Sequence, residues 1–165
     1  MTDRVNQRLL AIYLQDHLAA ATGGVELFRR AARPHRGTPL GDTLEALVLE
    51  ITSDRQAMLD VMRLLGVQPQ PVKVAAAWAA EKVGRLKMNG SVRSRSPLSD
   101  VVELEAMRTG VEGKAAAWRL LQTMAEYDTR LADVDFAGLL ERAQRQSEQL
   151  DRLRLEVARD RLVEH

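Results

Sequence analysis

Cysteine is absent from this chain of 165 residues. Its absence excludes disulfides, thiolate metal sites and cysteine nucleophiles, and it is typical of proteins of the reducing cytoplasm, which is the location we expect here. No apolar run approaches the roughly 20 residues that a membrane-spanning helix needs. Residues 1–8 are polar rather than apolar. We therefore expect neither an export signal nor a membrane anchor.

A charge of one sign is also lacking, because 24 basic residues are matched by 23 acidic ones and the net charge is +1. No global electrostatic field therefore points to nucleic acid or to an anionic membrane. The sequence contains no glycine-rich phosphate loop, no Gly-x-Ser-x-Gly and no His-Glu-x-x-His motif. These absences favour a non-catalytic protein over an enzyme, and we assign no catalytic residue.

Proline is scarce and clustered. The five prolines fall into three groups, at positions 34 and 39, 69 and 71, and 97, separated by long stretches rich in Ala, Leu, Arg and Glu. Because a proline costs about 3 kcal/mol inside a helix, these groups mark helix ends. Thr38 is a suitable N-cap and Pro39 suits the first helical turn. The sequence predicts five helices, at about residues 3–33, 39–65, 71–88, 97–127 and 135–162.

The pattern predicts one all-α domain that spans residues 1–165. No segment alternates with the period of two that is typical of strands, so we expect no sheet. The connection between the second and fourth helices, residues 66–96, is far longer than the about 2 to 8 residues that join antiparallel neighbours. We therefore expect a four-helix bundle with one long crossover, and a fifth short helix within that crossover.

Polar residues interrupt the apolar stripe of three long helices near their midpoints. His17 lies in the stripe of the first helix, and Asp54 in that of the second with Glu50 one turn earlier. Gln146 interrupts the stripe of the last helix, with Gln149 beside it. Helices of similar length that pack side by side bring their midpoints to one height. We therefore expect a buried polar layer formed by His17, Glu50, Asp54, Gln146 and Gln149.

Buried carboxylates need a partner, because an isolated buried charge costs several kcal/mol. His17 is the simplest candidate partner for Asp54 and Glu50, and Arg55 or Arg108 are further candidates. One interpretation is a hydrogen-bonded network that fixes the helix register. The other is a metal ion held by the acidic side chains.

The second helix resembles that of the bacterioferritins, within the ferritin-like superfamily. The run from Glu50 to Arg55, followed by Leu64-Leu65-Gly66, is similar to the family's Glu-x-x-His helix. By this resemblance Glu50 stands at the metal-binding glutamate, whereas Ser53 replaces the histidine. His17-Leu18-Ala19 resembles the region of the first ligand glutamate. The run from Gln146 to Gln149 resembles the second Glu-x-x-His motif with both ligands replaced, and Glu105 or Glu112 stands for the remaining glutamate.

These departures argue against a di-iron centre, because amides supply no charge to balance two cations. A single divalent ion, Fe, Mn or Zn, is compatible with His17, Glu50, Asp54 and Glu112, since imidazole and carboxylates suit these metals. Our leading hypothesis is a bacterial ferritin-like protein without a cofactor, acting as a structural or interaction module. The alternative is a metal-binding redox protein with this reduced ligand set.

A third hypothesis is a bundle that binds a small molecule or phosphate. Gly23, Gly24, Gly110 and Gly113 weaken their helices by roughly 1 kcal/mol each, so they serve either close packing or a small cavity bordered by Trp118 or Tyr13. The basic stretch from Arg85 to Arg95 lacks aromatic residues for base stacking, so we do not expect nucleic-acid binding. The apolar segment around Trp78 suggests a surface shared with a second copy, and we expect a homodimer.

Overall fold

The computed structural model describes residues 4–70, 96 and 98–163, and all the regular elements in these ranges are helices. They are α1 (Gln7–Ala32), the short 3-10 helix η1 (Arg33–His35), α2 (Pro39–Leu64), α4 (Ser99–Met124), the 3-10 helix η2 (Thr129–Leu131) and α5 (Phe136–Leu162). The all-α class is therefore confirmed for the described residues. The predicted short helix at 71–88 and the basic stretch from Arg85 to Arg95 lie outside them.

The long helices begin and end close to the predicted positions, because their capping signals are local. Thr38 accepts a hydrogen bond from the Gly41 amide at 3.2 Å, and Pro39 occupies the first turn of α2 as expected. Asn6 caps α1 and Asp135 caps α5 in the same way. Gly66 follows α2 with a φ of 71°, a left-handed conformation that glycine adopts without strain.

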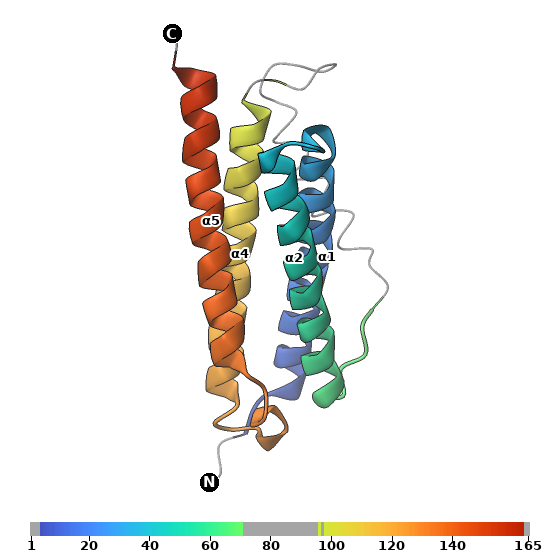
Figure 1. Ribbon diagram of the computed structural model, residues 1–165. Coiled ribbons are helices and arrows are strands. Elements are labelled where there is room, and N and C mark those ends of the chain that lie inside the picture. The colour runs from blue at the N-terminus through green and yellow to red at the C-terminus, as the bar shows by residue number, and fades with distance from the viewer. Residues whose placement is uncertain (1–3, 71–95, 97, 164–165) are drawn as a thin grey trace.

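The four long helices pack side by side in one bundle (Figure 1). α1 pairs with α2 and α4 pairs with α5, while α1 also contacts α4 and α2 contacts α5 more sparsely. α1 and α5 run in one direction along the bundle, and α2 and α4 run in the other (Figure 1). The end of α2 and the start of α4 therefore lie at opposite ends of the bundle.

Polar contacts close both ends of the bundle. At one end the His35 side chain lies 2.9 Å from an Asp100 oxygen, which joins the end of α1 to the start of α4. At the other end Arg130 donates to Asp128, to the Leu65 carbonyl at 3.1 Å and to Gln7 at 2.9 Å. The second cluster thus connects the link between α4 and α5 with the end of α2 and the start of α1.

The apolar interior is divided into two clusters of buried side chains. Phe28, Ile51 and Val111 belong to the cluster near the start of α2, and Met58 and Trp118 belong to the other. Fully burying an aliphatic or aromatic side chain of this size stabilises the fold by about 1.5–3 kcal/mol. The boundary between the clusters on α2 and α4 is where polar side chains enter the interior.

None of the helices in residues 4–70 and 98–163 combines the length and the apolar character that crossing a membrane requires.

Candidate functional site

Asp54 is the most deeply buried acidic residue at mid-height, with 2% of its surface exposed. It lies on α2 between Ile51 and Met58, one from each apolar cluster, because a spacing of three and four residues keeps all three on the inward face. Its carboxylate accepts three hydrogen bonds from α4 and α5. One oxygen accepts from Lys114 and, at 3.1 Å, from Gln146, and the other accepts from Arg142 Nε at 2.7 Å and also lies 2.5 Å from Arg142 Nη2 in an ion pair.

Gln146 on α5 is 1% exposed and uses both ends of its amide. Its oxygen accepts from Lys114 at 2.5 Å, and its nitrogen donates to Glu50 at 2.9 Å as well as to Asp54. Glu50 itself lies on the exposed side of α2 and reaches the network only at its carboxylate. The amide therefore links one ammonium group to two carboxylates.

The network is balanced in charge. Asp54 and Glu50 supply two negative charges, and Lys114 and Arg142 supply two positive ones. Burial lowers the pKa of Lys114, and the neighbouring Asp54 acts in the opposite direction. The carboxylate that the sequence left without a defined partner is thus neutralised by two cations from α4 and α5.

His17 does not join this network, contrary to expectation. It is half-buried on α1, its ring centroid lies 4.4 Å from that of Tyr13, and its imidazole makes no hydrogen bond within the described residues. Burial lowers its pKa, and Asp16 opposes that shift. Arg55 also does not pair with Asp54, because its Nε donates to Thr22 at 2.9 Å.

Glu112 belongs to a separate polar cluster between α4 and α5. Its carboxylate accepts from the buried Ser147 hydroxyl at 2.5 Å. Arg108 donates to the same hydroxyl at 3.4 Å and lies 3.3 Å from Asp151, so it also is not a partner of Asp54. Gln149 is half-buried and makes no hydrogen bond to any described residue.

The expected metal ligands are therefore not assembled. Across residues 4–70 and 98–163, no group of three or more histidine or acidic side chains lies close enough to hold a metal ion. Of the four predicted ligands, His17 lies on the cavity described below and Glu112 lies in the cluster with Ser147. Only Glu50 and Asp54 meet, through the Gln146 amide.

Lys114 and Arg142 are the network residues that the sequence interpretation missed. Lys114 lies three residues after Val111 and four before Trp118, so it interrupts the inward stripe of α4 as Asp54 interrupts that of α2. Arg142 precedes Gln146 by one helical turn. The spacing alone was enough to identify Lys114, but a lysine in a stripe is usually assigned to the solvent-exposed edge.

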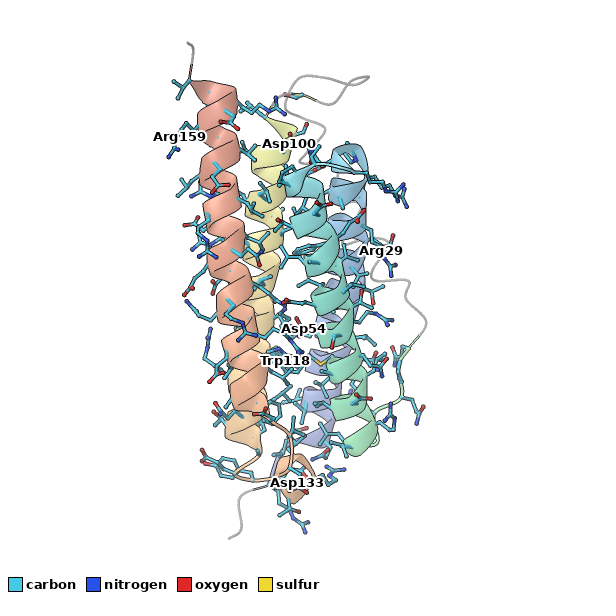
Figure 2. All side chains as sticks on the ribbon, in the orientation of Figure 1. Arg29, Asp54, Asp100, Trp118, Asp133 and Arg159 are labelled. Atoms are coloured by element: carbon cyan, nitrogen blue, oxygen red, sulfur yellow. The ribbon has the colours of Figure 1, made fainter. Side chains whose placement is uncertain are left out.

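A cavity of about 170 Å³ adjoins the network between α1, α2 and α4. Apolar side chains form most of its wall, and its polar or charged lining residues include His17, Asp54, Arg55, Thr109 and Lys114. Trp118 lines it as well, and Figure 2 shows Asp54 and Trp118 at neighbouring heights in the bundle interior. The polar network and the cavity thus share a border.

The indole N–H of Trp118 is buried and has no hydrogen-bond acceptor among the described residues. The ring packs against Phe136, with centroids 6.4 Å apart. Most buried polar groups in proteins are hydrogen-bonded, so an unpaired donor beside a cavity is a feature to be explained.

Comparison with protein-family models, with curated proteins and with solved structures finds no match to this chain.

Proposed function

We propose that this protein is a non-catalytic helical bundle of ferritin-like topology in which a buried salt-bridge network takes the place of a metal centre. The observation that carries the proposal is the position of the Lys114 ammonium group, which donates to both Asp54 and Gln146. In metal-binding bundles carboxylates in the core bind a metal, whereas the core carboxylate Asp54 of this bundle pairs with a protein cation.

The direction of the helices supports the ferritin-like topology. α2 and α4 run in the same direction, so the end of α2 and the start of α4 lie at opposite ends of the bundle (Figure 1). Parallel second and third long helices are typical of the ferritin-like arrangement, whereas helices joined by short loops alternate in direction.

The charge balance argues against a metal-dependent role. A divalent ion beside Asp54 would be repelled by Lys114 and Arg142, which already neutralise the two carboxylates. Both cations would have to leave before a metal could bind with favourable electrostatics.

The proposed role of the network is to hold the hairpin of α1 and α2 in one register against the hairpin of α4 and α5. α2 and α5 have few backbone contacts. The hydrogen bonds that Arg142 and Gln146 of α5 donate to Asp54 of α2 therefore help to hold these two helices together. A slip of one helical turn would leave Asp54 buried without its donors, at a cost of several kcal/mol.

Elemental analysis tests the absence of a metal centre. The protein is purified from cells grown with added iron, manganese and zinc, and its thermal unfolding is recorded with and without a chelator. We expect far less than one metal ion per chain and an unchanged melting temperature. Near-stoichiometric metal that is lost in the Asp54→Asn variant would contradict the proposal.

A variant without the central ion pair tests the role in register. Asp54→Leu combined with Lys114→Met replaces this pair with apolar side chains and leaves Glu50 and Arg142 in place. We expect a helical protein that binds a dye for exposed apolar surface and gives broadened amide resonances, because several registers become comparable in free energy. Sharp, native-like spectra from this double variant would contradict a register role.

A homodimer remains part of the proposal. Leu9 and Ile12 lie one turn apart on α1 and are 63% and 52% exposed, and Leu49 on α2 is 73% exposed. Exposed apolar side chains at helical spacing suit contact with a second copy. Light scattering across a range of protein concentrations measures the mass, and a monomer at all concentrations contradicts this part of the proposal.

A further inference from the structure

The cavity beside the charge network is kept open by missing side chains. Gly24 on α1 and Gly110 and Gly113 on α4 all line it, and a Cβ added to any of them would meet no atom within 4 Å. Close packing in the described structure therefore does not require these glycines. Each weakens its helix by roughly 1 kcal/mol relative to alanine. The role of these glycines is therefore to leave the cavity open and not to stabilise the helix.

The size of the cavity limits what can enter it. An apolar cavity of about 150 Å³ in another protein binds benzene, so one of about 170 Å³ here accepts a molecule with one six-membered ring. Gly110 and Gly113 are exposed whereas Phe28 and Trp118 are buried. The cavity therefore leads from the surface of α4 into the apolar interior.

Two residues that line this cavity each carry a polar group that has no hydrogen bond within the described residues. One is the buried Trp118 N–H, which can only donate. The other is the imidazole of His17, which offers an acceptor nitrogen in its neutral form. Burial lowers the pKa of His17, which favours the neutral form of the imidazole.

The charged groups on the border are already engaged. Lys114 donates to Asp54 and Gln146, and Arg55 donates to Thr22 through its Nε. Asp54 accepts three hydrogen bonds and also forms an ion pair with Arg142. A charged ligand would disturb this balance, whereas an uncharged one would leave it intact. The chemistry of the cavity thus favours a neutral molecule.

From these observations we infer that the cavity between α1, α2 and α4 is a binding site for a small, uncharged phenol-like molecule. Its ring fills the apolar space beside Phe28, and its hydroxyl oxygen accepts a hydrogen bond from the Trp118 N–H. The hydroxyl hydrogen is donated to the neutral His17 imidazole. This site is independent of the structural role proposed for the charge network.

Phenol and toluene are matched probes, because they differ only in exchanging the hydroxyl for a methyl group of similar size. The chain contains two tryptophans, Trp78 and Trp118. The Trp78→Phe variant therefore serves as the parent protein, because Trp118 is its only tryptophan. Its single indole N–H resonance is followed by 1H–15N NMR during titration. We expect phenol to shift it downfield in a saturable way and to bind about five- to tenfold more tightly than toluene.

Variants that fill the cavity test whether phenol binds there. Gly110→Leu places a side chain at the mouth, where the structure has room for it, and Gly113→Leu serves as a second variant of the same kind. Ala116→Leu is the control, because Ala116 is exposed on α4 and does not line the cavity. Phenol binding is expected to be lost at least tenfold in the glycine variants and retained in the control, with all proteins folded by circular dichroism.

Three results overturn the assignment. The first is that phenol fails to bind the parent protein. The second is equal binding of phenol and toluene without an indole shift, which would mean an apolar cavity without polar recognition. The third is undiminished phenol binding to both glycine variants, which would place the site elsewhere. None of these results depends on metal content or on helix register, so none of them would contradict the proposed function.

Discussion

The ammonium group of Lys114 on α4 donates a hydrogen bond to the buried carboxylate of Asp54 on α2, across the boundary between the two apolar clusters. The side chain of Lys114 is 14% exposed and that of Asp54 is 2% exposed. An ion pair this deeply buried stabilises a fold only while both partners are present, because either charge alone is costly to bury.

Removing one partner of this pair is therefore expected to be severe. Lys114→Met should lower the free energy of unfolding by about 3 kcal/mol, somewhat reduced by the bonds that Asp54 keeps with Arg142 and Gln146. Urea denaturation at pH 7 measures this change. Arg63→Met is the control, because the pair of Arg63 and Asp60 is exposed and should contribute less than about 1 kcal/mol.

A double-mutant cycle separates the pair from its surroundings. Asp54→Leu combined with Lys114→Met should be less destabilised than the sum of the single variants, by at least about 1 kcal/mol, because neither charge is left buried alone. Strict additivity would show that the two groups do not interact.

The Asp128 carboxylate at the other end of the bundle predicts an acid-dependent loss of stability. Hydrogen bonds from Arg130 lower the pKa of Asp128 from 3.8 to about 2. The carboxylate therefore stabilises the fold fully above pH 4, and this contribution is lost as the pH falls toward 2. Asp128→Asn should cost about 1 kcal/mol at pH 7, because the side chain of Arg130 is 44% exposed and solvent screens the pair.

Chemical denaturation at a series of pH values measures this effect. The difference between the wild-type protein and Asp128→Asn should be constant from pH 7 to pH 4 and vanish near pH 2. A difference that stays constant down to pH 2 would mean that the carboxylate charge contributes nothing.

Two glycines predict opposite effects of the same substitution. An alanine Cβ at Gly41 would lie 1.9 Å from the His35 carbonyl oxygen, so the backbone between α1 and α2 has to move. We expect Gly41→Ala to destabilise the protein by about 2 kcal/mol or more. Gly110→Ala meets no atom within 4 Å and should stabilise α4 by up to about 1 kcal/mol.

Thermal unfolding of the two variants under identical conditions provides the comparison. If Gly110→Ala also destabilised the protein, the space beside that residue would be needed for the native packing itself.

The half-buried His17 predicts a second pH dependence, closer to neutral pH than that of Asp128. Because burial lowers its pKa below 6.5, the unfolded chain binds the proton more readily, and the fold loses stability as the pH falls through 6.5. An NMR titration of the imidazole should give a pKa below 6.5. Asp16→Asn should lower that pKa further, since Asp16 favours the charged form. A value at or above 6.5 in the wild-type protein would contradict this account.

The sequence predicted the helices of the described chain well, because the signals that limit them are local. Prolines, the Thr38 cap and the left-handed Gly66 act within one turn of the helix ends they define. The long connection after Gly66 led us to expect a bundle with one crossover. In the described residues α2 and α4 run in the same direction (Figure 1).

The mid-height polar layer was predicted only in part. Asp54 and Gln146 are buried and hydrogen-bonded to each other, as their positions in apolar stripes indicated. His17 occupies the same kind of position and lines the same cavity as Asp54, yet it makes no hydrogen bond to Asp54. Periodicity fixes which side of a helix turns inward, but it does not fix the rotation of one helix against another.

By itself, then, the sequence determined the helical class, the helix ends and the height at which polar groups enter the interior, since each depends on spacing along one helix. Only the tertiary structure decided that Lys114 and Arg142 neutralise Asp54, and that the glycines of α1 and α4 border a cavity beside Trp118. These relationships join residues that are far apart in the chain, and the packing angles and rotations of whole helices determine them.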